Sequence, residues 1–108
     1  MATSALGEFE QFVLLALVRQ GNDAYGVPVC KDIADRTGRD VSLGAVYKAL
    51  DRLENKGFVQ SRLGEPTPER GGRRKKHFKV LAAGHRALTQ SLVALRRMTD
   101  GLEADLKL

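Results

Sequence analysis

The residues with the clearest chemical character form one cationic segment, Arg70-Gly71-Gly72-Arg73-Arg74-Lys75-Lys76. Its arginines and lysines would repel one another unless an anionic partner offset their charge. The two glycines can adopt the positive φ of a tight turn without a Cβ clash. The segment therefore predicts a cationic loop that fits the phosphate backbone of a nucleic acid. The alternative interpretation is a solvated turn whose charges only confer solubility.

Catalytic chemistry is less well supported by the residue types. Cys30, His77 and His85 could nominally supply a nucleophile and bases, but neither histidine has a recognisable acid to orient it. No carboxylate pair, phosphate loop or metal-ligand spacing is present in the sequence. We therefore predict that the protein is not an enzyme and uses no cofactor or metal. Cys30 is the single cysteine, so an internal disulfide is impossible, which agrees with a reducing compartment.

Length and charge bound the class of protein. A chain of 108 residues with 43% hydrophobic and 29% charged residues predicts one small globular domain. The net charge of +5 favours nucleic acid or another anionic surface as partner. The first apolar run, Phe12 to Val18, is too short to span a bilayer and follows Glu8 and Glu10. These features predict a soluble cytoplasmic protein that does not bind a membrane.

Periodicity predicts two helices in the first third of the chain. The first has two apolar stripes, and the second stripe, with Leu14 and Leu15, indicates contact with a partner chain or with the C-terminal helix. The next helix is expected from about Gly26 to Thr37, with Asp23 as a possible cap and Gly38 in the left-handed position after its end.

A third helix is expected after Ser42, which can cap it. Its predicted core stripe consists of Leu43, Val46, Leu50 and Leu53, and its opposite face carries Tyr47, Lys48, Asp51 and Arg52. Lys56 and Gly57 are expected to end it. The first turn contains only small residues besides Leu43, namely Ser42, Gly44 and Ala45. They could let the helix approach a DNA groove closely, or they could only ease packing against the preceding helix.

The rest of the chain predicts a β-hairpin and a long helix. Residues 58–63 and 75–81 alternate between apolar and polar types, with the cationic segment in the loop between them. From Gly84 to the end we expect one helix, because a mostly apolar series recurs at steps of four and three at Leu88, Leu92, Leu95, Thr99, Leu102 and Leu106. Such a seam favours pairing with a second copy of the chain, and folding back on the first helix is the alternative.

Five motifs in order give the chain a family resemblance. They are Leu6-Gly7-Glu8-Phe9-Glu10, Asp23-Ala24-Tyr25-Gly26, residues 41–47 (VSLGAVY), residues 50–57 (LDRLENKG) and Glu69-Arg70-Gly71-Gly72-Arg73. Together they resemble the PadR-like winged helix-turn-helix regulators over nearly the whole chain. The resemblance implies a mainly α fold with a small β-hairpin, in which a three-helix core and a two-stranded wing precede a long C-terminal dimerisation helix. Residues 1–81 would form the DNA-binding domain and residues 82–108 the dimerisation helix.

The resemblance also implies a function. It predicts a sequence-specific transcriptional regulator that binds double-stranded DNA as a homodimer. Such a regulator is commonly a repressor that binds a palindromic operator and often leaves it when a small effector binds to the protein. The implied DNA-binding residues are Ser42, Ala45, Tyr47, Lys48, Arg52, Arg70, Arg73, Arg74 and Lys75. The expected dimerisation residues are Leu14, Leu15, Leu88, Leu92, Leu95, Leu102 and Leu106. The alternative is a winged-helix module that binds proteins and has lost specific DNA binding.

Overall fold

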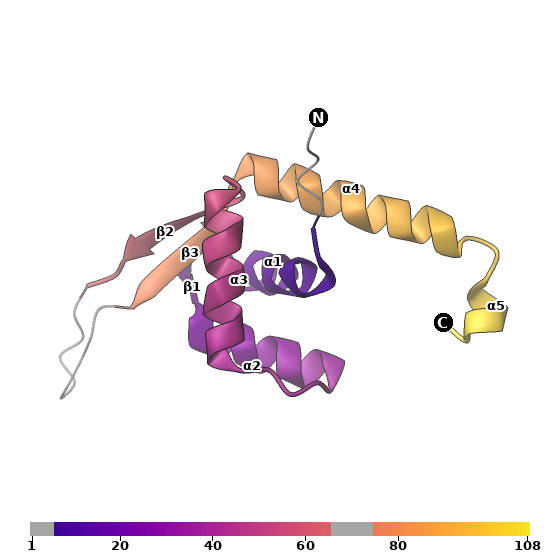
Figure 1. The fold of residues 1–108 in the computed structure, drawn as a ribbon, viewed down its shortest axis with the longest axis horizontal. Helices are drawn as coiled ribbons and strands as arrows, with labels where there is room; N and C mark the ends of the chain where they lie inside the picture. Colours follow the sequence, from indigo (N-terminus) through magenta and orange to yellow (C-terminus); the bar gives the residue numbers. More distant parts are fainter. Residues whose placement is uncertain (1–5, 66–74) are drawn as a thin grey trace.

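The computed structural model describes residues 6–65 and 75–108. In chain order the elements are α1 (Glu8–Gln20), the 3₁₀ turn η1 (Gly21–Asp23), β1 (Ala24–Tyr25), α2 (Gly26–Thr37), α3 (Leu43–Asn55), β2 (Val59–Leu63), β3 (Lys76–Val80), α4 (Ala82–Thr99) and α5 (Glu103–Leu106). Helices α1, α2 and α3 pack together, the sheet lies beside them, and α4 extends along one side past the other elements (Figure 1). The arrangement is a three-helix core with a small sheet and a long C-terminal helix, as the sequence predicted.

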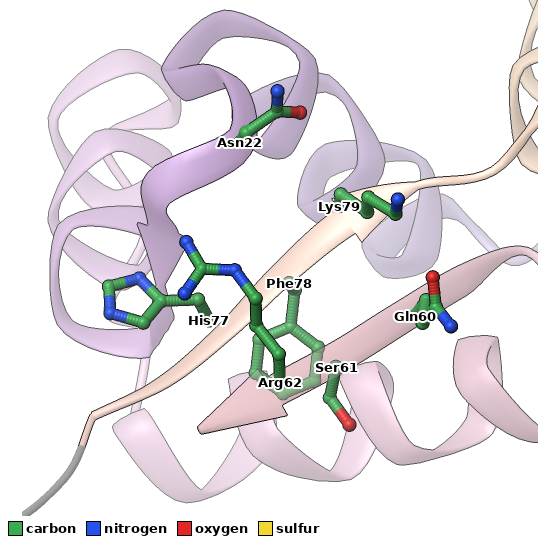
Figure 2. A pocket seen from close by; sticks show the side chains of 7 residues that line it. All are labelled: Asn22, Gln60, Ser61, Arg62, His77, Phe78 and Lys79. Atoms are coloured by element: carbon green, nitrogen blue, oxygen red, sulfur yellow. The ribbon is translucent and has the colours of Figure 1, made fainter. Parts of the chain in front are cut away.

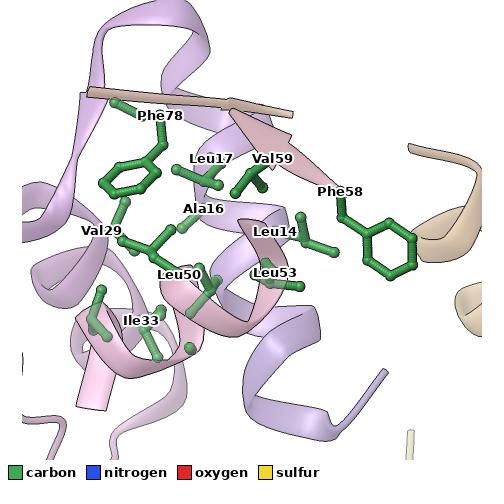
Figure 3. Close-up of a cluster of buried hydrophobic side chains, with 14 of the residues drawn as sticks. Leu14, Ala16, Leu17, Val29, Ile33, Leu50, Leu53, Phe58, Val59 and Phe78 are labelled. Atoms are coloured by element: carbon green, nitrogen blue, oxygen red, sulfur yellow. The ribbon is translucent and has the colours of Figure 1, made fainter. Parts of the chain in front are cut away.

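The core lies between the three helices and the sheet (Figure 3). Its largest fully buried side chains include Leu14 and Leu17 of α1, Leu50 and Leu53 of α3, and Phe78 of β3. Burial of each such side chain contributes about 1.5–3 kcal/mol. The prediction that Leu14 contacts a partner chain was wrong. Its side chain is fully buried in the core of its own chain, so no surface is left for a partner.

The ends of α2 and α3 agree with most of the predicted signals. Helix α2 has the predicted bounds, and Gly38 follows it in the left-handed region with φ of 72°. Ser42 caps α3, since its Oγ accepts a hydrogen bond from the Ala45 N–H at 3.0 Å. Two details were wrong: the N-cap of α2 is Tyr25 and not Asp23, and Leu43 is 39% exposed and lies outside the core stripe.

The sheet has one strand more than the predicted hairpin. The order is β1-β3-β2, and β3 pairs antiparallel with both neighbours. In β1, Ala24 lies opposite Phe78 and Tyr25 lies opposite His77. A strand of two residues is too short to show an alternating pattern, so only the pairing with β3 reveals it.

The C-terminal region does not form the predicted continuous helix. Helix α4 ends at Thr99, Gly101 takes a positive φ of 84°, and the four-residue α5 follows. Leu102 and Leu106 therefore fall beyond α4, and the seam expected from Leu88 to Leu106 is interrupted.

Helix α4 divides into a half that packs on the core and a half that does not. Leu88 is buried and Leu92 is partly buried against the core, whereas Leu95 is 58% exposed. Gly84 lies so close to the turn before β2 that a Cβ there would be 2.3 Å from the Phe58 carbonyl oxygen. The alternative that this helix folds back on its own chain thus holds for its N-terminal half.

Candidate nucleic-acid interface

The first turn of α3 is open to solvent. Ser42 and Gly44 are exposed, and a Cβ built on Gly44 would meet no atom within 4 Å. The small residue at position 44 is therefore not required by the packing of α3 against α2. Ala45 is half-buried. A helix N-terminus with free backbone N–H groups and little side-chain bulk can approach an anionic surface closely.

Tyr47 has a packing role that the sequence did not indicate. Its side chain is half-buried, and a Cβ on Gly26 would lie 2.5 Å from Tyr47 Cζ and 2.6 Å from its hydroxyl oxygen. The Tyr47 ring therefore lies directly against the first residue of α2, and only glycine leaves it room. Gly26 and Tyr47 lie far apart in the sequence, so no local sequence pattern indicates that they are in contact.

Lys48 and Arg52 differ in how freely they can bind a ligand. Lys48 is exposed, and no ion pair is formed by it within residues 6–65 and 75–108. Arg52 is also exposed, but its Nε lies 3.5 Å from an oxygen of Glu10. Arg52 is thus partly held by its own chain, whereas the Lys48 ammonium group is available to an anionic partner.

Glu10 connects the start of α1 to the end of α3. Its side chain is only 7% exposed, accepts a hydrogen bond from the Gly7 N–H at 2.8 Å, and lies 3.0 Å from Lys56 Nζ. Burial alone would raise the pKa of Glu10, but the hydrogen bonds from Gly7 and Lys56 and the charges of Lys56 and Arg52 outweigh it. The pKa of the Glu10 carboxyl is therefore lowered, and the carboxylate holds the C-terminal end of α3 in place.

Basic residues of α2 and of the link to α3 are neutralised by acidic neighbours. Lys31 pairs with Asp35 at 2.7 Å, Arg36 pairs with Asp32 at 2.7 Å, and Arg39 pairs with Glu8 at 2.6 Å. The partner carboxylate raises the pKa of Lys31. In this part of the surface each of these cations has a carboxylate beside it, which an anionic ligand would have to displace.

The strands bring a further cation to the side of the molecule where α3 begins. Lys75 is exposed; its Nζ lies 3.4 Å from the Tyr25 hydroxyl and 4.5 Å from the centre of the Tyr25 ring, a cation–π geometry. In Figure 1, α3 begins at the lower end of the drawn helix, the ends of β2 and β3 nearest their connecting loop lie at the lower left, and α4 lies along the top. The predicted residues Arg70, Arg73 and Arg74 lie outside the described part of the chain.

Sites for other chemistry are not evident in the described residues. Within 6–65 and 75–108, no three His, Cys, Asp or Glu side chains gather in a way that could hold a metal ion. Cys30 is half-buried, and its Sγ lies 3.3 Å from the Val41 carbonyl oxygen. No helix in the described ranges is long and apolar enough to cross a membrane.

The sequence matches a family of transcriptional regulators. Residues 14–90 match the model of the transcriptional regulator PadR-like family. A PadR family transcriptional regulator from Eggerthella lenta is 25% identical, with a TM-score of 0.68 over 92% of this chain and 86% of that chain. A PadR-like transcriptional regulator from Bacillus cereus is 17% identical, with a TM-score of 0.72 over 93% and 92% of the two chains.

A third similar structure is a transcriptional regulator from Clostridium thermocellum, 22% identical, with a TM-score of 0.70 over 88% of this chain and 89% of that chain. No curated protein matches the sequence.

Proposed function

Since this chain belongs to the PadR-like family of transcriptional regulators, we propose that it binds a specific DNA sequence as a homodimer and represses transcription from a palindromic operator. The observation that carries the proposal is the open first turn of α3, where Ser42 and Gly44 are exposed, together with Lys48 of the same helix, which is exposed and forms no ion pair with another described residue. The cations of α2, by contrast, are neutralised by their own carboxylates.

The proposed complex places the N-terminal end of α3 in the major groove. Ser42 and Ala45 would lie near base edges there, while Lys48 and Arg52 would bind phosphates. Binding to DNA would require Arg52 to turn from Glu10 or to share its guanidinium with a phosphate. Tyr47 would act mainly by holding α3 on α2.

The wing would make the second contact. Lys75 follows directly on the sequence segment that contains Arg70, Arg73 and Arg74, and these side chains would bind phosphates or enter a narrow minor groove. Because such contacts release counterions, we expect the DNA affinity to fall steeply as salt is added.

The proposed dimer uses the exposed half of α4. Leu95 is 58% exposed and Met98 is 76% exposed, and both border a shallow hollow of about 320 Å³ that Gln11 of α1 also lines. Apolar side chains gathered at such a surface favour burial against another protein. A second copy would bring two α3 helices to one duplex, with half-sites about one helical turn apart. A small effector that alters how the two chains pair would release the protein from its operator.

The experiment that tests the proposal is selection of bound duplexes from a random DNA pool by the purified chain at near-physiological salt. Enrichment of an inverted repeat is the expected result. The affinity for the selected duplex should then fall several-fold in Lys48→Gln, and the slope of log affinity against log salt should decrease by about one. Lys31→Gln is the matched control, because it removes the same charge from a lysine that is already paired with Asp35.

Two other outcomes would contradict the proposal. Salt-sensitive binding that enriches no sequence would identify a non-specific DNA-binding protein. If no duplex binds, the chain is better explained as a winged-helix module for protein partners, and the exposed half of α4 would be the surface to test.

A further inference from the structure

The outer face of the sheet carries polar side chains that converge on a hollow of about 330 Å³. In the register of β2 and β3, Arg62 lies opposite His77 and Gln60 lies opposite Lys79. Phe78, between the two β3 residues, is buried toward the helices. Because side chains alternate along a strand, these four point away from the core, and Figure 2 shows Arg62 and Lys79 on either side of the open space.

The hollow is rich in hydrogen-bond donors. Lys79 is exposed and forms no ion pair with another described residue. Asn22 and Gln60, also exposed, add amide groups that can donate from the rim. His77 Nδ1 lies 2.9 Å from the Asp23 carbonyl oxygen. Since a carbonyl can only accept, this nitrogen carries the proton and the contact fixes the ring beside Arg62.

One acidic residue, Asp23, competes for these donors. Its Oδ1 lies 3.1 Å from Arg62 Nη2, but the side chains of Asp23 and Arg62 are 88% and 56% exposed. Ion pairs this exposed contribute little. An incoming anion can therefore bind the remaining N–H groups of Arg62 without a large loss.

We propose that this outer face binds the phosphate group of a small ligand. Two cations from neighbouring strands, with amide donors at the rim, match the several acceptor oxygens of a phosphate, and an arginine can donate two parallel hydrogen bonds to it. The size of the hollow leaves room for a small organic part as well. The site does not depend on the proposed function, so it can be tested on the protein without DNA.

The test is a titration of the full isotope-labelled chain with pyrophosphate at constant ionic strength, followed by nuclear magnetic resonance. We expect shift changes concentrated at residues 22, 60–62 and 77–79. Binding should weaken at least tenfold in Arg62→Gln combined with Lys79→Gln. Gln60→Glu places a negative charge in the hollow and keeps both cations, and it should also weaken pyrophosphate binding. The matched control is Lys31→Gln combined with Arg36→Gln, which removes the same charge from α2.

Equal weakening in both double variants, or shift changes spread over α3 and α4, would show adventitious counterion binding and overturn the proposal. The same variants should be titrated with the selected duplex. If the Arg62 and Lys79 changes lower the DNA affinity as much as Lys48→Gln does, the face belongs to the DNA interface and the small-ligand assignment is wrong. Thermal unfolding of each variant identifies any loss of fold.

Discussion

At the scale of single residues, Gly44 distinguishes two explanations for the small residues at the start of α3: close approach to a DNA groove, or packing against α2. The position of Gly44 is open, because a Cβ added there would have no atom within 4 Å apart from its chain neighbours and the backbone of its own helix. Gly44→Leu should keep or raise the free energy of unfolding, by up to about 1 kcal/mol, because leucine is the better helix former. If this turn enters a DNA groove, the same change should lower the affinity for the selected duplex at least tenfold, as measured by fluorescence anisotropy. Unchanged DNA affinity would place the interface elsewhere.

Glu10 is the residue whose charge should matter most for stability. Glu10→Gln should lower the free energy of unfolding at pH 7 by about 2 kcal/mol, because Lys56 and Arg52 lose a largely buried anionic partner. Urea denaturation measures the change. Glu8→Gln is the control, because Glu8 is an exposed carboxylate paired with Arg39 and should have a small effect.

The pH dependence of stability follows from the lowered pKa of Glu10. A group whose pKa is lower in the folded state than in the unfolded state stabilises the fold above the unfolded value, which for glutamate is about 4.3. This contribution is lost as the pH falls from about 4.3 through the folded pKa. The wild type should therefore lose more stability than Glu10→Gln between pH 5 and pH 3. Parallel pH profiles would show that Glu10 is not the titrating group. The pKa of Glu54 is also lowered, mainly by the hydrogen bond from the Ser61 hydroxyl. Protonation of Glu54 at low pH should therefore lower the stability of the wild type and of Glu10→Gln alike.

At the scale of elements, the contact between Gly26 and Tyr47 sets how α2 meets α3. Gly26→Ala should lower the free energy of unfolding by about 1–3 kcal/mol, because the added methyl overlaps the Tyr47 ring. Tyr47→Ala should also destabilise the protein, but the double variant should be more stable than the sum of the two changes predicts. Additive effects in chemical denaturation would mean that the two residues do not share this contact.

At the scale of the whole molecule, the exposed half of α4 determines whether two chains associate. Leu95→Asp combined with Met98→Asp should convert the proposed dimer to a monomer in sedimentation velocity, since both side chains are more than half exposed in the single chain. The fold should remain, because neither residue belongs to the buried core. Leu63→Asp, at an equally exposed leucine of β2, is the control and should leave the association unchanged. A dimer that persists in the α4 variant would require another interface.

The amino-acid sequence determined the local features of this protein. The bounds of α2, the Ser42 cap, the glycines that follow α2 and α3 and most of the α3 core stripe depend on residues close together in the chain, and local periodicity and capping chemistry are sufficient to predict them. The five ordered motifs also predicted the family. The exposed Lys48, Asp51 and Arg52 agree with the predicted outer face of α3.

Tertiary structure decided whatever depends on contacts between distant residues. Leu14 and Leu88 are apolar at the spacing expected of an interface, yet they are buried within their own chain, because periodicity shows which side chains avoid water and not which partner covers them. The two-residue β1 exists through its pairing with β3. Ion pairs across the fold decide which cations remain available: Arg52 lies against Glu10, and Arg39 against Glu8. The outer hollow arises for the same reason, since Arg62 and Lys79 come to the same face of one sheet only when β2 pairs with β3.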